Sequence, residues 1–198
     1  MDLGATLLST GWASGVNAYA TVALLGILGR AGVGEVPEPI QSDPAIAVAS
    51  IMFLIEFVAD KIPYVDSMWD AVHTVVRPSI ASVIGGLYGT DADLSGLEEA
   101  FAAGGSGATA LASHGVKASI RLAINTSPEP ASNIAVSLAE DGVVAVVVLL
   151  VVEHPEIAAA IAAVLLVGGV TLVVFVAKRV RRGLARWRER RKPPLLPK

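Results

Sequence analysis

The 198-residue chain lacks cysteine, which excludes disulfide bonds, thiolate metal sites and cysteine nucleophiles. It is also poor in charge, with 17% Asp, Glu, Lys and Arg against about 25% in a typical soluble domain. Hydrophobic residues make up 54% of the chain, and its mean hydropathy is +0.64. This combination predicts an integral membrane protein.

Common enzyme motifs are missing as well. The sequence has no glycine-rich phosphate loop, no serine elbow and no zinc signature, which weakens the case for an enzyme, and we expect no cofactor. The first residues, MDLGATLLSTGWASG, lack the positively charged region of a signal peptide. We therefore expect the amino terminus to remain as part of the first helix.

Basic residues are scarce in the body of the chain and concentrated at its end. Ten of the fifteen Lys and Arg residues lie in 178–198. Within that segment Val180, Leu184 and Trp187 recur at the spacing of one helix face. The pattern predicts a basic amphipathic C-terminal helix, a cytoplasmic tail that binds anionic lipid head groups. No nucleic-acid partner is expected, because the tail directly follows a membrane segment.

Apolar runs recur along the rest of the chain, at 3–28, 45–63, 78–89, 94–125, 134–152 and 156–177. Most are long enough to cross about 30 Å of hydrocarbon as a helix. They predict an all-α, polytopic membrane helix bundle of about six spans. The run at 78–89 is short, so whether it spans fully stays open. The segment 63–77 before it has polar and apolar faces, which predicts a short helix at the membrane interface.

Four landmarks occur in the same order in the two halves of the chain. They pair Gly15–Ala18 with Gly115–Ala118, Pro37–Pro39 with Pro128–Pro130, Ala59–Asp60 with Glu140–Asp141, and Pro78–Ala81 with Pro155–Ala158. We interpret 1–177 as one membrane domain built from repeat one, about 3–90, and repeat two, about 94–177. Three spans per repeat is an odd number, so the second copy enters the membrane in the opposite sense. This is the inverted repeat of many transporters.

The distribution of charge predicts the orientation of the chain. The basic tail places the carboxyl terminus in the cytoplasm, and six spans then place the amino terminus there as well. Loops 35–43 and 91–99 would face outward, and they contain seven acidic residues and no Lys or Arg. Arg30, on the outer side, does not fit this rule. We expect a multi-pass protein of the inner (plasma) membrane, with the bilayer as its partner and a homo-oligomer left open.

Several blocks of the sequence resemble a known family. They are SGVNAYATVALLGILGR, FVADKIPYVDSMWDAVHTVVRP, HGVKASIRLAINTSPEPASN and the pair Glu140–Asp141. Together they resemble an uncharacterised bacterial membrane family catalogued as domain of unknown function 4126, over about residues 8–155. The resemblance implies a multi-span membrane protein and carries no established activity.

Ionisable residues inside the apolar runs are the strongest functional signal, because a charged group in hydrocarbon costs several kcal/mol unless it is paired or hydrated. The natural partners of the acidic residues are the basic residues near 114–121, and Asn17 is the repeat equivalent of Lys117. The candidate substrate- or ion-binding residues are Asn17, Glu56, Asp60, His114, Lys117, Arg121, Glu140 and Asp141. The alternative is that these groups pair with one another merely to hold the repeats together.

A second group of polar residues lies on the interface helix. Asp66, Asp70 and His73 have a spacing compatible with a metal site, but solvated residues on an amphipathic helix are the favoured interpretation, and the metal question stays open. Tyr19 is expected to be a packing or interface residue. We therefore expect a small transporter or channel for an ion or small solute. The alternatives are a non-catalytic assembly or scaffold module and, less favoured, a lipid-modifying enzyme that uses Asp66, Asp70 and His73.

Overall fold

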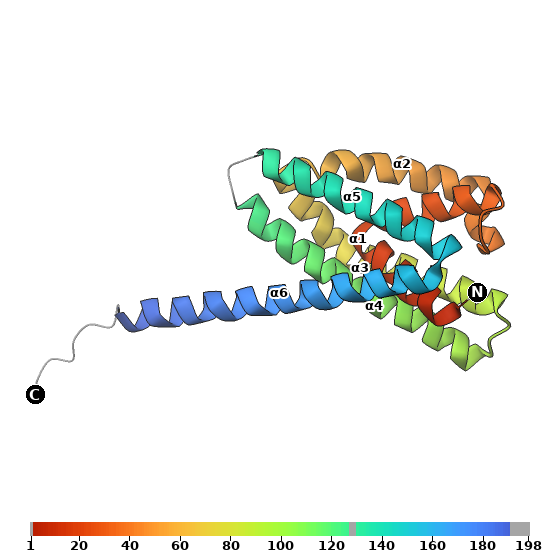
Figure 1. Cartoon of the computed structure of the whole chain (residues 1–198). Coiled ribbons are helices and arrows are strands. Elements are labelled where there is room, and N and C mark those ends of the chain that lie inside the picture. Colours follow the sequence, from red (N-terminus) through yellow and green to blue (C-terminus); the bar gives the residue numbers. More distant parts are fainter. Residues whose placement is uncertain (1, 127–129, 191–198) are drawn as a thin grey trace, which may run out of the picture.

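The computed structural model describes residues 2–126 and 130–190, and every regular element within those ranges is a helix. The elements are α1 (Leu3–Arg30), the short 3-10 helix η1 (Glu38–Gln41), α2 (Asp43–Ala59), α3 (Pro63–Asp91), α4 (Gly96–Asn125), α5 (Pro130–Glu153) and α6 (Pro155–Arg190). The all-α prediction is confirmed. Helices α1 to α5 form a bundle, and α6 starts against it and continues well beyond it (Figure 1).

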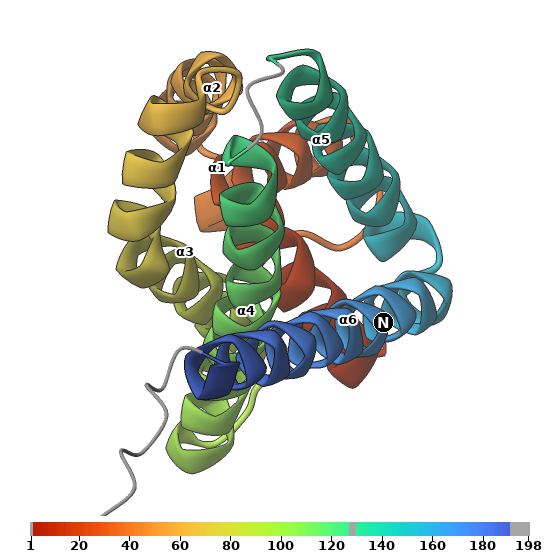
Figure 2. The ribbon, with the colours of Figure 1, turned by 90° about the vertical axis from the view of Figure 1, so that its left-hand side faces the viewer.

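Helix α1 is the central element of the bundle. It contacts each of the other five α-helices, which surround it when the bundle is viewed along its long direction (Figure 2). Small residues allow this close approach. A Cβ atom on Gly11 would lie 2.8 Å from the carbonyl oxygen of Ser106 in α4, and one on Gly15 would clash with Ser113. Such small-residue contacts are the usual way in which membrane helices approach closely.

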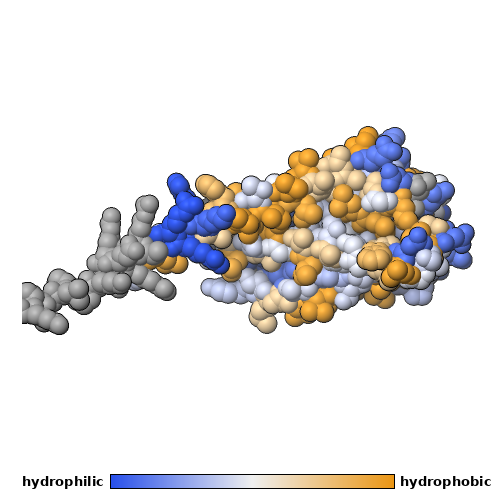
Figure 3. Space-filling model, turned by 90° about the horizontal axis from the view of Figure 1, so that it is seen from below, coloured by the Kyte–Doolittle hydropathy of each residue, from blue (hydrophilic) through white to orange (hydrophobic). Residues whose placement is uncertain are grey.

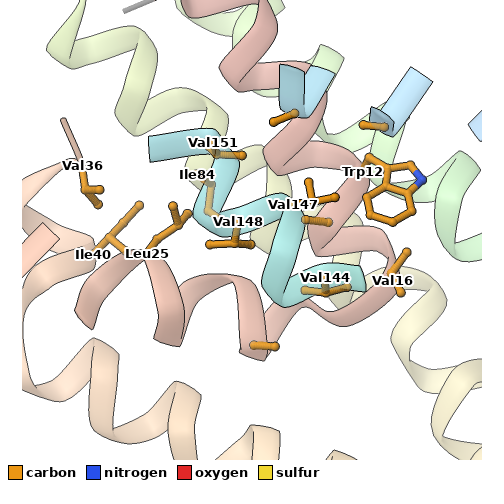
Figure 4. Packing of buried hydrophobic residues seen from close by; sticks show 14 of the residues in the cluster. Trp12, Val16, Leu25, Val36, Ile40, Ile84, Val144, Val147, Val148 and Val151 are labelled. Carbon is orange, nitrogen blue, oxygen red and sulfur yellow. The ribbon is translucent and has the colours of Figure 1, made fainter. Parts of the chain in front are cut away.

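The apolar core lies between α1 and α5. Val144, Val147, Val148 and Val151 recur at i, i+3, i+4 and i+7, so they form one face of α5. All four are buried in one cluster that includes Trp12, Val16 and Leu25 of α1 and Ile84 of α3 (Figure 4). This packing fixes α5 against the middle of α1.

Three helices of the described residues are long and apolar enough to cross a membrane: Leu3–Arg30, Ala131–Glu153 and Pro155–Leu184. On the face shown in Figure 3, hydrophilic residues gather at two ends and hydrophobic residues predominate between them. Large apolar side chains are exposed on α2, α3, α4, α5 and α6. These features indicate association with a membrane.

The structure corrects the prediction of a separate interface helix before residue 78. Helix α3 runs from Pro63 through Pro78 to Asp91, so the predicted interface helix and the short third run are one helix of 29 residues. Its polar face is covered by the bundle, whereas apolar side chains such as Met68 and Val75 are exposed. The sequence pattern predicts that the polar face is exposed to water, and this prediction is wrong.

Two other segments differ from a simple series of apolar helices joined by exposed loops. The connection after α1 is not wholly exposed, because Val36 and, within η1, Ile40 are buried in the core. Helix α6 continues without interruption from the last apolar run into the basic segment, as far as Arg190. The tail residues 191–198 and the Pro128–Glu129 part of the repeat landmark lie outside the described residues.

Candidate functional site at a break in helix α1

The centre of the site is a break in α1 at Asn17. Its backbone has φ −150° and ψ 98°, an extended conformation inside a helix of 28 residues. The side-chain oxygen of Asn17 accepts a hydrogen bond from the backbone N–H of Ala20 at 2.9 Å. Asn17 therefore caps the amino end of the second half of α1, in the way that Asn caps ordinary helices.

The carboxyl end of the first half of α1 is capped by cations from other helices. Lys117 of α4 donates from Nζ to the carbonyl oxygen of Val16 at 3.0 Å, and Arg77 of α3 donates to that of Gly15 at 3.4 Å. Ser113 donates to the carbonyl of Trp12 at 3.0 Å. Positive groups are favourable there, because the carboxyl end of a helix carries partial negative charge.

Arg77 forms one half of a buried polar cluster around this break. Its Nη2 lies 2.6 Å from Glu56 Oε1 of α2, and its Nη1 lies 3.2 Å from Oδ1 of Asp70, which is about two turns earlier on α3. The same Nη1 lies 2.6 Å from His114 Nδ1. Because arginine only donates, Nδ1 of His114 is the acceptor, and its Nε2–H faces the carbonyl of Asp70 at 3.1 Å. His114 is thus held in its neutral form.

Lys117 and Arg121 of α4 form the other half. Lys117 Nζ lies 2.9 Å from Asp60 Oδ2, 3.6 Å from Glu56 Oε1 and 3.7 Å from Glu140 Oε2. Arg121 Nη2 lies 3.2 Å from Asp60 Oδ2 and 3.0 Å from Glu140 Oε2. The acids come from α2 and α5 and the cations from α4, so the charges join three helices at the break.

Polar groups of α3 and α5 complete the cluster. Arg121 Nη1 donates to Asn133 Oδ1 at 2.6 Å, and its Nε lies 3.9 Å from Asp66 Oδ1. Asn17 Nδ2 donates to Asp141 Oδ1 at 3.1 Å. We define the buried polar cluster as Asn17, Glu56, Asp60, Asp66, Asp70, Arg77, His114, Lys117, Arg121, Asn133, Glu140 and Asp141.

The cluster contains more acids than cations. Among the described residues, its six carboxyl groups outnumber the three cations Arg77, Lys117 and Arg121, while His114 is neutral. Lys61 lies close enough to Asp60 and Asp141 to interact with them electrostatically. Within the described residues, Glu56 Oε2, Asp60 Oδ1 and Asp141 Oδ2 are buried without a hydrogen-bond partner. Since buried ionised carboxylates need partners, the cluster has capacity for protons or for an additional cation.

Two cavities reach the cluster from different sides. One, of about 430 Å³, lies between α1, α4, α5 and α6, and both Lys117 and Glu140 line it. The other, of about 210 Å³, lies between α3 and α4, and Asp70 lines it. Most side chains of the cluster are buried, whereas Glu140 and Asp141 are partly exposed, and 17% of the Glu140 side chain is accessible.

All eight residues that the sequence singled out meet in this cluster. The structure brings together Asn17, Glu56, Asp60, His114, Lys117, Arg121, Glu140 and Asp141, although they come from four helices. Their role in binding stays a prediction. Sequence reasoning missed Arg77, Asn133 and Ser113 as members or neighbours of the site. Arg77 continues the stripe of Asp66, Asp70 and His73 by one turn, which is a signal that was present in the sequence.

The expectation that Asp66, Asp70 and His73 are solvated is wrong, because all three are buried. They do not share a ligand site either. Asp66 accepts from Asn125 at 2.7 Å, and His73 stands between the Trp69 carbonyl at 2.7 Å and Tyr19 Oη at 3.0 Å. Within the described residues, no group of three or more His, Asp or Glu side chains is arranged to hold a metal ion. Tyr19 is therefore a hydrogen-bonding partner of α3 as well as a packing residue.

A comparison with known sequence families tests the family resemblance that several blocks of the sequence indicate. The family described as "Domain of unknown function (DUF4126)" matches residues 5–175. The chain belongs to this family. The match spans α1 through most of α6, so it includes every residue of the buried polar cluster. No curated protein and no solved structure matches the chain.

Proposed function

We propose that the protein is a small transporter or channel that moves an ion or small solute across the inner membrane through the buried polar cluster. The break in α1 is the observation that carries this proposal. Many transporters bind their substrates near the membrane midplane at broken helices, where free helix ends and buried charges meet. Here Asn17 and Val16 form those ends, and both contact charged residues of other helices.

The two cavities support movement rather than static binding. Asp70 and Glu140 lie at opposite ends of the ion-paired chain, and each lines a different cavity. Asp70 is linked to Glu140 through Arg77, Glu56 and Lys117 by distances of 2.6 to 3.7 Å. An ion or proton exchanged along this chain would be handed between neighbouring groups.

A six-span architecture accompanies the proposal. Helices α3 and α4 are 29 and 30 residues long, enough to cross about 30 Å at 1.5 Å per residue. Their mean hydropathy is lowered by charges that face the bundle interior, while Val72, Phe101 and Leu122 are exposed on the outside. Helix α2 has 17 residues and exposes Ile51 and Leu54. All three helices therefore have an exposed apolar face, which a six-span arrangement would place against lipid.

The inverted repeat and the orientation belong to the same proposal. Repeat one is α1 to α3 and repeat two is α4 to α6, with both termini in the cytoplasm. Arg30, which does not fit the charge rule, forms an ion pair with Asp43 at the end of α1. The exposed basic side chains Lys178, Arg179, Arg181 and Arg182 at the far end of α6 would contact anionic lipid head groups.

A scaffold function is the second candidate, and the ion pairs made by all three cations of the cluster favour it. Ion pairs between helices also fix the register of those helices, a role documented for buried polar groups in other proteins. The lipid-modifying enzyme is not favoured, because Asp66, Asp70 and His73 hold separate partners.

Flux measurements on the full-length chain in liposomes distinguish the two candidates. We expect flux of protons or of one ion from a panel of cations and small anions. Asp60→Asn and Lys117→Gln should lower that flux by about tenfold or more, while the exposed controls Asp93→Asn and Lys178→Gln should not. Absence of flux for the whole panel would support the scaffold. Unchanged flux in both cluster variants would show that the solute does not pass through the buried polar cluster.

A further inference from the structure

The larger cavity differs in character from the cluster that it touches. Its walls are apolar side chains of α4, α5 and α6, including Val116, Val136 and Leu165, and they are interrupted only by Ser113, Lys117 and Glu140. Its volume of about 430 Å³ falls in the usual range for small-molecule sites. Trp12 of α1 adds an aromatic ring to the lining. The site therefore fits a largely apolar molecule with one polar or charged end.

The charge of that end follows from the two ionisable residues in the wall. Lys117 Nζ has three protons, and it already serves the Val16 carbonyl, Asp60 and two further carboxylates within 3.7 Å. An anionic ligand would have to compete with these groups. It would also approach a cluster in which carboxyl groups outnumber cations, where its charge would be repelled.

Glu140 offers the opposite chemistry. Its Oε2 contacts Arg121 and Lys117, whereas Oε1 takes part in no ion pair or hydrogen bond among the described residues. Its side chain is 17% accessible, compared with 2% for Lys117. A positive ligand could thus pair with Glu140 without breaking the existing ion pairs. An indole such as that of Trp12 adds to cation binding, because its ring face attracts positive charge.

From this cavity we propose that the protein binds a lipophilic cation, an apolar molecule with a single delocalised or quaternary positive charge. The charge pairs with Glu140, and the apolar body occupies the space between α4, α5 and α6. The inference deepens the proposed function by naming the class of solute that is transported, and in that respect it rests on the proposed function. The binding step itself does not depend on transport.

The cavity offers a variant that fills it without changing any charge. Gly168 lines it, and a Cβ atom built there has no heavy atom of the described residues within 4 Å beyond its own chain neighbours. Gly168→Leu therefore adds bulk to the site with little strain on the helix. Gly183 on the same helix is equally open and is not among the lining residues, so Gly183→Leu is the matched control.

Equilibrium binding of radiolabelled tetraphenylphosphonium to the full-length chain in nanodiscs of zwitterionic lipid tests the inference. We expect saturable binding that is weakened by about tenfold or more in Glu140→Gln, since a charged partner is lost. Gly168→Leu should weaken binding to a similar degree, and Gly183→Leu and Glu98→Gln should bind like the wild type. Labelled oleate should bind no better than to empty nanodiscs.

Several results would overturn the inference. They are the absence of saturable tetraphenylphosphonium binding, equal binding by the wild type and both site variants, or saturable binding of oleate in place of the cation. Ion flux without cation binding would remove this inference and leave the proposed function in place. Cation binding without any flux would contradict the proposed function and leave the binding inference in place.

Discussion

Asn17 Nδ2 donates to Asp141 Oδ1 at 3.1 Å, and Lys117 Nζ donates to Asp60 Oδ2 at 2.9 Å. The sequence landmarks align Asn17 with Lys117 and Asp60 with Asp141. Each contact therefore joins the first helix of one repeat to the second helix of the other. Such reciprocity is what a pseudo-twofold relation between two copies produces, and it supports the inverted repeat that we propose.

Replacing Asn17 by Ala should destabilise the protein by about 1–2 kcal/mol, because the second half of α1 loses its amino-terminal cap. The change also removes the partner of Asp141 Oδ1. Unfolding in mixed micelles, followed by circular dichroism, measures the loss. Ser79→Ala removes an exposed hydroxyl that bonds within its own helix and should change stability little. Equal stability of the two variants would show that Asn17 does not cap α1.

Removing the buried guanidinium of Arg77 should destabilise the protein more than replacing Asn17 by Ala. Arg77→Met leaves Asp70 without its cation and leaves Glu56 with Lys117 alone, at 3.6 Å, and breaking a buried pair costs about 3–5 kcal/mol. The double variant Arg77→Met with Glu56→Leu should recover part of this loss, because the carboxylate that lost its closest cation disappears. A double-mutant cycle from the same unfolding assay gives the coupling between the two residues. Additive losses would contradict a direct interaction.

The equivalent glycines Gly15 and Gly115 should respond in opposite ways to Ala. A Cβ on Gly15 would clash with Ser113 and approach the Cα of Ala110 to 2.8 Å, so α1 and α4 would have to separate. A Cβ on Gly115 meets no heavy atom of the described residues within 4 Å, its own neighbours aside. Gly15→Ala should lower the melting temperature, whereas Gly115→Ala should leave it unchanged or raise it, since Ala favours helix by roughly 0.5–1 kcal/mol. Matching effects at the two sites would be inconsistent with the close α1–α4 contact.

The number of spans can be measured directly because the chain has no native cysteine. Single Cys residues in place of Glu38, Asp93 and Arg182 can be labelled with a membrane-impermeant maleimide in intact cells and in inverted vesicles. Six spans predict labelling of the first two from outside and of the third from the cytoplasm. If only α1, α5 and α6 crossed the membrane, positions 38 and 182 would be labelled from the same side.

The residues of the site were largely predictable, because ionised groups inside apolar runs need partners and few partners exist. The need for partners is enough to identify Asp60, Lys117 and Glu140 from the sequence. The same reasoning fails for α3, where Asp66 and Arg77 are on a polar stripe that the sequence shows clearly. Periodicity reveals that a helix has two different faces. It does not reveal which face water, lipid or protein covers.

The sequence by itself determined the membrane character, the all-helical fold and the alignment of the landmarks that contain Asn17 and Lys117, since hydropathy, proline and glycine act locally along the chain. Only the tertiary structure decided that α1 breaks at Asn17, that cations of α3 and α4 cap the broken end, and that the polar face of α3 turns inward. Those outcomes depend on groups far apart in the chain, such as Gly15 and Arg77, separated by 62 residues, or Val16 and Lys117, separated by 101. These interactions form only when the helices pack. In the low-dielectric interior, each charge is stable only beside its partner.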